Sequence, residues 1–140
     1  MLNALERTFG VELEFICDNK NALATHINRT CGQNTVKVEN YNHTTQTYWK
    51  LITDSSVHAT TPADRRARLE GFELVSPILK GESGLSVIRA IMDAIDTYTG
   101  IAKVNKSCGY HLHLQADDLN LKQLKNIMKA QVKYEWVLDC

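Results

Sequence analysis

The sequence has no excess of either charge and no long apolar run. Its 140 residues include 16 lysines and arginines and 16 aspartates and glutamates, so the formal net charge is zero. A balanced charge gives no electrostatic reason to expect a nucleic-acid partner. No stretch approaches the roughly 18 consecutive apolar residues that a membrane-spanning helix needs. We therefore expect neither nucleic acid nor a membrane as a partner.

Export signals and paired cysteines are also missing. The N-terminal stretch MLNALERTFGVELEF lacks the basic start and the continuous apolar centre of a signal peptide. The four cysteines are Cys17, Cys31, Cys108 and Cys140, and no two of them form a C-x-x-C pair. Without an export signal they are expected to be reduced thiols, which predicts a cytoplasmic protein.

What remains is the pattern of a globular domain, with 44% apolar and 23% charged residues. Period-two alternation and helical periodicity predict the order strand, helix, three strands, helix, strand, helix. The strands cluster instead of alternating strictly with helices, which predicts an α+β fold with a mostly antiparallel sheet. The expected strands lie within 7–17, 34–41, 45–54, 69–79 and 107–116, and the expected helices within 18–32, 81–100 and 117–140, with a loop over 55–68.

The last predicted helix would be capped by Asp117 or Asp118 and reaches Cys140 without a stop signal. We expect residues 1–140 to form a single domain that lacks a C-terminal part.

Acids and imidazoles occupy one face of three predicted strands. Residues i and i+2 of a strand point to the same side, so Glu12 and Glu14 share a face, as do His111 and His113. Glu73 lies opposite the apolar face of its own strand. Each pattern alone is typical of the solvated side of a sheet. If the strands are neighbours, however, one surface carries up to three carboxylates and two imidazoles.

Such a surface would need a cation, because clustered carboxylates repel one another and tend to protonate. Oxygen-rich ligands with one or two imidazoles suit Mg²⁺ or Mn²⁺. Zinc is the competing interpretation, since Cys108, His111 and His113 form a C-x₂-H-x-H set. Strand parity argues against it, because Cys108 should face away from His111.

Four segments resemble the amidoligase family in their order and approximate spacing. They read FGVELEF, WKLITDSSV, GFELVSPIL and NKSCGYHLHLQAD. The family comprises ATP-dependent carboxylate–amine ligases, and the resemblance implies the catalytic fold of glutamine synthetase and glutamate–cysteine ligase. That fold is a mostly antiparallel, curved sheet with helices packed on one face. Family members usually continue past the last predicted helix into a segment with phosphate-binding arginines.

The resemblance also implies roles for individual residues. Glu12, Glu14 and Glu73 correspond to acids that bind the divalent cations, Mg²⁺ or Mn²⁺, that hold ATP. His111 and His113 correspond to the histidines beside the metal and the phosphates, with His113 a further metal ligand. Glu12, His111 and His113 would therefore contact Mg·ATP.

The implied catalytic group is Asp54, Glu73 and His111, with Asp54 orienting the amine or the acceptor. The implied reaction joins the carboxylate of a small molecule or a peptide to an amine through an acyl phosphate. A homo-oligomer or a complementing subunit would supply what this chain lacks. The alternatives are a catalytically inactive binding or assembly protein with the same fold, and a zinc-dependent hydrolase that uses His111 and His113.

Overall fold

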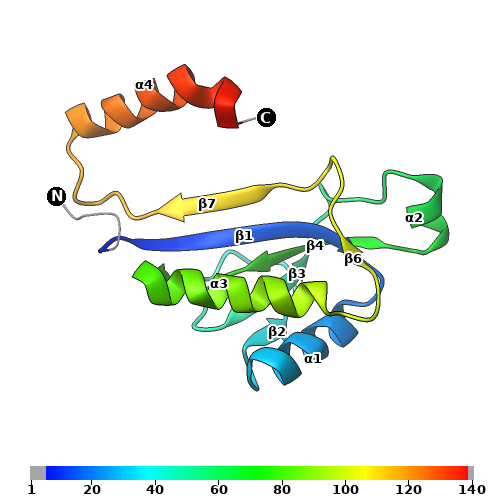
Figure 1. The fold of residues 1–140 in the computed structure, drawn as a ribbon. Helices are drawn as coiled ribbons and strands as arrows, with labels where there is room; N and C mark the ends of the chain where they lie inside the picture. Colours follow the sequence, from blue (N-terminus) through cyan, green and yellow to red (C-terminus); the bar gives the residue numbers. More distant parts are fainter. Residues whose placement is uncertain (1–5, 139–140) are drawn as a thin grey trace.

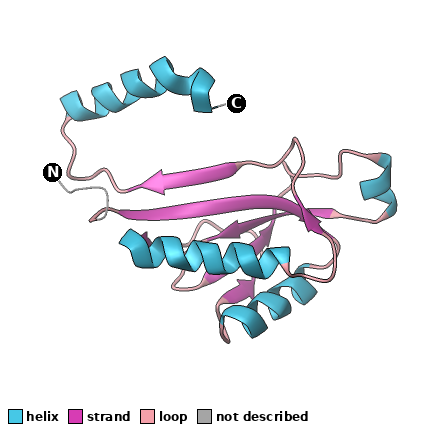
Figure 2. Ribbon diagram, in the orientation of Figure 1, coloured by secondary structure: helices cyan, strands magenta, loops and turns pink. Residues whose placement is uncertain are grey.

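The computed structural model describes residues 6–138, which form a mixed α/β structure with a mostly antiparallel seven-stranded sheet and four helices (Figures 1 and 2). This arrangement confirms the predicted mixture of helices with a mostly antiparallel sheet. In chain order the elements are β1 (Thr8–Cys17), α1 (Lys20–Cys31), β2 (Val36–Val38), β3 (Trp49–Thr53), α2 (Pro62–Arg66), β4 (Glu70–Val75), β5 (Leu79–Lys80), α3 (Gly81–Asp96), β6 (Ala102–Lys103), β7 (Tyr110–Leu114) and α4 (Leu121–Leu138).

The long strand β1 lies at the centre of the site-bearing part of the sheet. Glu12 of β1 is in register with Val75 of β4 on one side and with His111 of β7 on the other, both antiparallel. From β4 the sheet continues through β3 to β2. The short strands β5 and β6 pair with the two ends of β1. Strands far apart in the sequence therefore meet on either side of β1.

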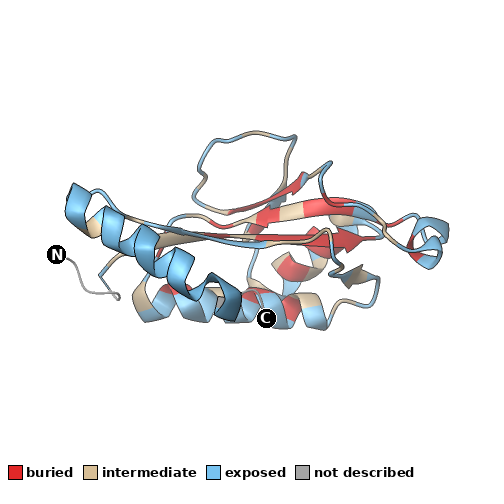
Figure 3. Ribbon diagram, turned by 90° about the horizontal axis from the view of Figure 1, so that it is seen from above, coloured by how far each residue is buried: buried red, intermediate tan, exposed pale blue. Residues whose placement is uncertain are grey.

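The core lies on the helix side of the sheet. Val11, Leu13 and Phe15 of β1 are buried together with Phe72 and Leu74 of β4, as their alternation in the sequence predicts. Helices α1 and α3 cover this face (Figure 1). Figure 3 shows the buried residues concentrated in this sheet and the helices beneath it.

Helix α1 begins and ends where the sequence predicts. The Asn19 side chain accepts hydrogen bonds from the backbone amides of Asn21 and Ala22, which satisfies two of the unpaired N–H groups of the first turn. Gly32 ends the helix at a φ of 117°, in the region that glycine enters without steric cost.

The segment predicted as a loop over 55–68 contains the short helix α2. Thr61 caps it by accepting a hydrogen bond from the amide of Asp64, and Pro62 occupies the first helical turn. Asp64 is buried, and its carboxylate contacts Lys103 of β6 at 2.5 Å. The strands β5 and β6 were not predicted either, because two-residue strands are defined by their partner and carry no periodicity. β2 and β3 pair in parallel, an exception within the sheet.

Strand β7 and helix α4 differ from the rest of the molecule. All α4 side chains from 121 to 137 except Gln123 are exposed, so this helix does not pack on the sheet face with α1 and α3 (Figure 3). Asn120 caps α4 in place of the predicted Asp117 or Asp118: its side chain accepts from the amide of Gln123 at 3.0 Å, and the Gln123 side chain accepts from the amide of Asn120 at 2.8 Å.

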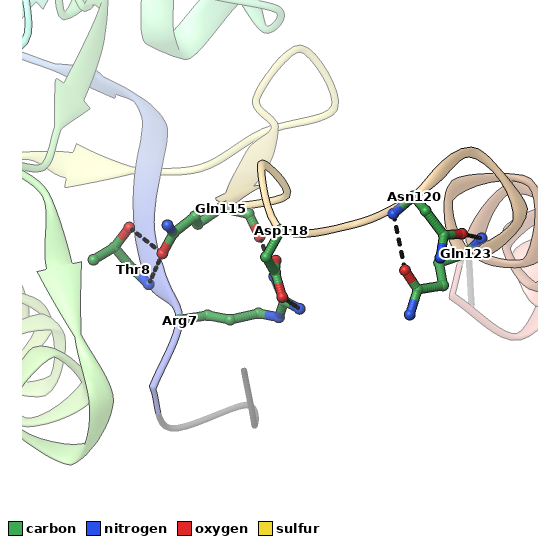
Figure 4. Close-up of polar contacts among 6 residues, drawn as sticks. All are labelled: Arg7, Thr8, Gln115, Asp118, Asn120 and Gln123. Carbon is green, nitrogen blue, oxygen red and sulfur yellow. Dashed lines mark hydrogen bonds and ion pairs between the residues drawn. The ribbon is translucent and has the colours of Figure 1, made fainter. Parts of the chain in front are cut away.

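Asp118 instead anchors the end of β7 to the start of β1. The Arg7 guanidinium donates to both Asp118 carboxylate oxygens at 2.6 and 3.0 Å and to the carbonyl oxygen of Gln115 at 2.6 Å (Figure 4). The Gln115 side chain accepts from the amide and the hydroxyl of Thr8, both at 3.2 Å.

The structure bears on two of the expectations, the absence of a membrane-spanning helix and the reduced state of the cysteines. None of the four described helices is long and apolar enough to cross a membrane. Among the described cysteines, Cys17, Cys31 and Cys108 are free thiols, whereas Cys140 lies outside the described residues.

Candidate metal and nucleotide site

The strand register brings the predicted site residues onto the face of the sheet opposite α1 and α3. Glu14 of β1 is in register with Glu73 of β4, and Glu12 is in register with His111 of β7. His113 follows His111 on the same side of β7 because successive side chains of a strand alternate. The three strands predicted to carry these acids and imidazoles, β1, β4 and β7, are therefore neighbours in the sheet.

A cavity of about 1000 Å³ covers this polar face. Its lining combines the sheet with the loops that precede and follow β3. All six of the predicted site residues line it: Glu12, Glu14, Asp54, Glu73, His111 and His113. Its volume is at the upper end of the range for small-molecule sites, which leaves room for a nucleotide or for two smaller substrates.

Glu12 is the centre of the polar network. Its Oε2 atom lies 3.1 Å from His111 Nδ1 and 3.2 Å from His113 Nε2. Burial opposes ionisation of this carboxyl, but hydrogen bonds from His113 and His111 hold its pKa below the ordinary value. Glu12 is therefore kept as a carboxylate between the two imidazoles.

Glu73 has the opposite environment. Burial, followed by the charge of Glu12 and a hydrogen bond with it, raises the pKa of Glu73 to about 7. The charges of Asp54 and Glu14 act in the same direction. Two neighbouring carboxyls thus differ in protonation near neutral pH.

Three of these side chains form a set that fits a metal ion. One ligand atom each from Glu12, Glu73 and His111 lie within 4.8 Å of one another. Two carboxylate oxygens and one imidazole nitrogen, in a cavity open to water, match the ligand preference of Mn²⁺ or Mg²⁺. A divalent cation here would also remove the repulsion that raises the pKa of Glu73.

Glu14 and His113, both predicted metal ligands, lie outside this set of three. Glu14 Oε2 accepts a hydrogen bond of 2.7 Å from the amide of Gly109, and its Oε1 lies 3.7 Å from His111 Nε2. A side chain at position 109 would meet His111, because a Cβ atom there would lie 2.8 Å from His111 Nε2. Glu14 and Gly109 thus hold His111 in place, and His113 does the same for Glu12.

Asp54 lies at the rim, in the loop after β3. Its Oδ1 atom accepts from the amide and the hydroxyl of Ser56, both at 2.7 Å, which is a local turn of the kind common after strands. Its charge nevertheless contributes to the raised pKa of Glu73. The structure therefore places Asp54 near the acids while one of its oxygens is engaged by the loop.

The set Cys108, His111 and His113 does not come together. The Cys108 thiol lies in a turn with Asn105, 3.6 Å from the Asn105 side-chain oxygen, and packs against the apolar cluster of Ile16, Val57 and Leu69. This position agrees with the parity argument against Cys108 as a zinc ligand.

Residues 41–45, in the loop between β2 and β3, also line the cavity but were not predicted as site residues. Tyr41, His43 and Lys50 contribute to the lining. A lysine inside the apolar strand WKLIT was a signal, because a charged side chain at a buried strand position needs partners.

Comparison with known proteins identifies the family of the chain. The chain matches the family model described as "Putative amidoligase enzyme" over residues 5–140. No curated protein and no solved structure matches the chain. A match of this extent covers the three strands that carry the acids and imidazoles. The chain belongs to the amidoligase family.

Proposed function

We propose that this chain provides the metal- and ATP-binding face of an ATP-dependent carboxylate–amine ligase. The observation that carries the proposal is the set of Glu12, Glu73 and His111, whose ligand atoms lie within 4.8 Å on the floor of a cavity of about 1000 Å³. Membership of the amidoligase family supports the reaction class. The same proposal includes correspondence of this sheet to that of glutamine synthetase-like ligases.

The chain's own residues would act mainly by binding and positioning. Glu12, Glu73 and His111 would hold Mg²⁺ or Mn²⁺, and His113 would keep Glu12 ionised and oriented. The cation supplies positive charge that offsets the charge of the transferring phosphoryl group. Because its pKa is raised, Glu73 would carry a proton in the metal-free site and would release it when the cation binds.

In the overall reaction, a substrate carboxylate attacks the γ-phosphate of ATP, and ADP leaves. The resulting acyl phosphate is attacked by an amine, which forms the amide and releases phosphate and a proton. Asp54, beside the acidic cluster, would orient the incoming amine. We propose small molecules or peptides as the source of the carboxylate and the amine.

Calorimetric titration with Mg·ATP tests the nucleotide role. We expect binding by the wild type and a loss of at least about tenfold in affinity for Glu12→Ala, because this change removes a ligand and the hydrogen-bond acceptor of both histidines. Glu82→Gln, on the exposed start of α3, is the matched control and should bind like the wild type. Equal affinity in wild type and Glu12→Ala would contradict the proposal.

Hydroxylamine tests the ligase chemistry without knowledge of the natural amine. It traps acyl phosphates as hydroxamates, so a panel of amino acids and dicarboxylates can be screened with Mg·ATP. Hydroxamate formation that depends on ATP and is lost in Glu12→Ala supports a ligase. Mg·ATP binding with no hydroxamate from any carboxylate favours the alternative of a binding or assembly protein.

That alternative has one specific observation in its favour. The apolar side of β7 and the apolar residues of α4 are exposed, including Leu112 and Trp136, at 53% and 73%. Surfaces of this kind commonly mark contacts with another chain. Self-association or a complementing subunit is therefore part of the proposal, and light scattering of the purified chain would detect the former.

A further inference from the structure

One wall of the cavity is formed by the loop between β2 and β3. Residues Tyr41, Asn42, His43, Thr44 and Thr45 line the same cavity as the acidic cluster. They belong to no helix or strand. A wall made of loop needs some other source of rigidity before it can recognise a ligand.

Lys50 of β3 provides that rigidity from below. Its side chain is buried, with 4% of the residue exposed, and its ammonium group donates to the carbonyl oxygens of Asn42 at 2.6 Å and Thr44 at 3.1 Å. A third contact, at 3.3 Å, reaches Asn42 Oδ1. The three donors of the ammonium group are thus all directed at the loop.

Asn42 completes the support. Its Oδ1 also accepts from the amide of Thr44 at 3.0 Å, and its Nδ2 donates to Glu39 Oε2 and to the carbonyl oxygen of Asn40, both at 2.8 Å. The Tyr48 hydroxyl donates to the other oxygen of Glu39, so the two ends of the loop are tied together.

This support has a cost that core packing does not explain. Burial of an ammonium group, even with the Glu39 carboxylate close enough to interact with it, is less favourable than burial of an apolar side chain of the same length. Lys50 is also the only lysine or arginine among the described residues that line the cavity. Local departures from favourable packing of this kind are typical of functional sites.

The loop presents rings to the cavity. Tyr41 and His43 form an edge-to-face pair with centroids 5.1 Å apart, and the Tyr41 hydroxyl lies 3.3 Å from His43 Nε2. Tyr41 is nevertheless 62% exposed, so its ring is not used by the protein core. Thr44 and Thr45 add hydroxyl groups to the same wall.

We propose that Lys50 is a positioning residue that holds the Tyr41–His43 wall as the binding surface for the nucleobase of ATP. The inference rests on the proposed function, in which the acidic cluster and its cation bind the phosphates. An exposed, rigid aromatic ring is suited to stacking on a purine, which is worth about tenfold or more in affinity. In the proposed function the carboxylates and imidazoles of the acidic cluster are engaged with the cation and the phosphates, which leaves the loop wall for the base.

The test separates base recognition from phosphate recognition. Calorimetry is performed with Mg·ATP and with Mg·tripolyphosphate, which has the phosphates without the base. The wild type is expected to prefer ATP by about tenfold or more. Tyr41→Ala and Lys50→Met should both lose most of this preference while their affinity for tripolyphosphate and for Mn²⁺ alone stays at the wild-type level.

Two variants guard against trivial outcomes. Tyr134→Ala removes another exposed tyrosine, on α4, and should keep the preference for ATP. Tyr41→Ala removes an exposed ring, so it tests the wall even if Lys50→Met does not fold. A wild-type preference for ATP that survives in Tyr41→Ala overturns the inference. A wild type that binds neither Mn²⁺ nor tripolyphosphate overturns the proposed function instead.

Discussion

Strands β4 and β7 flank β1 and alternate in the same way, yet only the apolar face of β4 is packed in the core. On β4, Leu74 is fully buried against the helices while Glu73 points into the cavity. On β7, His111 and His113 point into the cavity, but Tyr110, Leu112 and Leu114 on the other face are 53–60% exposed. The polar face of β7 is therefore held by its contacts with Glu12 and Glu14, without a core on the other side of the strand.

The same comparison separates two sources of stability in the site. The β4 half is fixed by hydrophobic burial, whereas the β7 half is fixed by backbone pairing with β1 and by the Arg7–Asp118 ion pair. The proposed metal ligands come from both halves. We therefore expect substitutions on the two strands to have different effects on the stability of the protein but similar effects on its affinity for the metal.

The first prediction compares the loss of stability on truncating an apolar side chain of β4 with that on truncating one of β7. Leu74→Ala should lower the free energy of unfolding by about 2–5 kcal/mol because it leaves a cavity in the core. Leu112→Ala should change it by less than about 0.5 kcal/mol because half of the side chain is already exposed. Urea denaturation followed by circular dichroism measures both. Equal losses would show that β7 is packed as firmly as β4.

The second prediction concerns the pH dependence of metal binding. Because the pKa of Glu73 is raised to about 7, the site must release a proton before this carboxyl can bind a cation. The affinity for Mn²⁺ should therefore rise about tenfold between pH 6 and pH 8 in the wild type. In Glu73→Gln the rise should be clearly smaller, because this carboxyl no longer has to lose a proton. An affinity in the wild type that is constant over this range would contradict the assignment.

The third prediction is a gain in stability at the expense of binding. A carboxyl with a raised native pKa favours folding at pH values below its unfolded pKa of about 4.5, and this contribution is lost as the pH rises through about 7. Glu73→Gln should therefore raise the Tm of the metal-free protein by about 2–5 °C at pH 8 and by much less at pH 5. Glu82→Gln on α3 is the control and should show no such pH-dependent gain.

The fourth prediction concerns the ion pair that anchors the end of β7. Arg7→Met removes the ion pair with Asp118 and should cost about 1 kcal/mol or less in global stability. Amide hydrogen exchange should become faster in residues 110–115 and stay unchanged in β4, because only β7 depends on this anchor. Arg89→Met, an exposed change on α3, should leave exchange in both strands unaltered. Faster exchange in β4 as well would refute a local role for Arg7.

Much of the fold could be predicted because its signals are local. The alternation of β1 and β4 and the Asn19 and Gly32 caps of α1 all appear in the chain itself. The five-residue helix α2 was missed although Thr61 and Pro62 are ordinary helix-start signals. The parallel pairing of β2 with β3 depends on tertiary contacts that no local pattern reports.

The site was predictable for a different reason. Strand parity placed Glu12, Glu73 and His111 on polar faces, and the family resemblance brought those strands together. The sequence alone could not show which neighbouring group each side chain contacts. The Glu14 carboxylate accepts a hydrogen bond from the amide of Gly109, and the Lys50 ammonium group donates to the loop at Asn42. Both contacts depend on distances between atoms that only the folded chain determines.

Manganese binding followed by electron paramagnetic resonance tests whether β4 and β7 each contribute a ligand to one metal site around Glu12. At pH 8 we predict one Mn²⁺ site in the wild type, and a loss of at least about tenfold in affinity in both Glu73→Gln and His111→Gln. Glu82→Gln should bind like the wild type. Wild-type affinity in His111→Gln, or no Mn²⁺ bound by the wild type, would contradict the account.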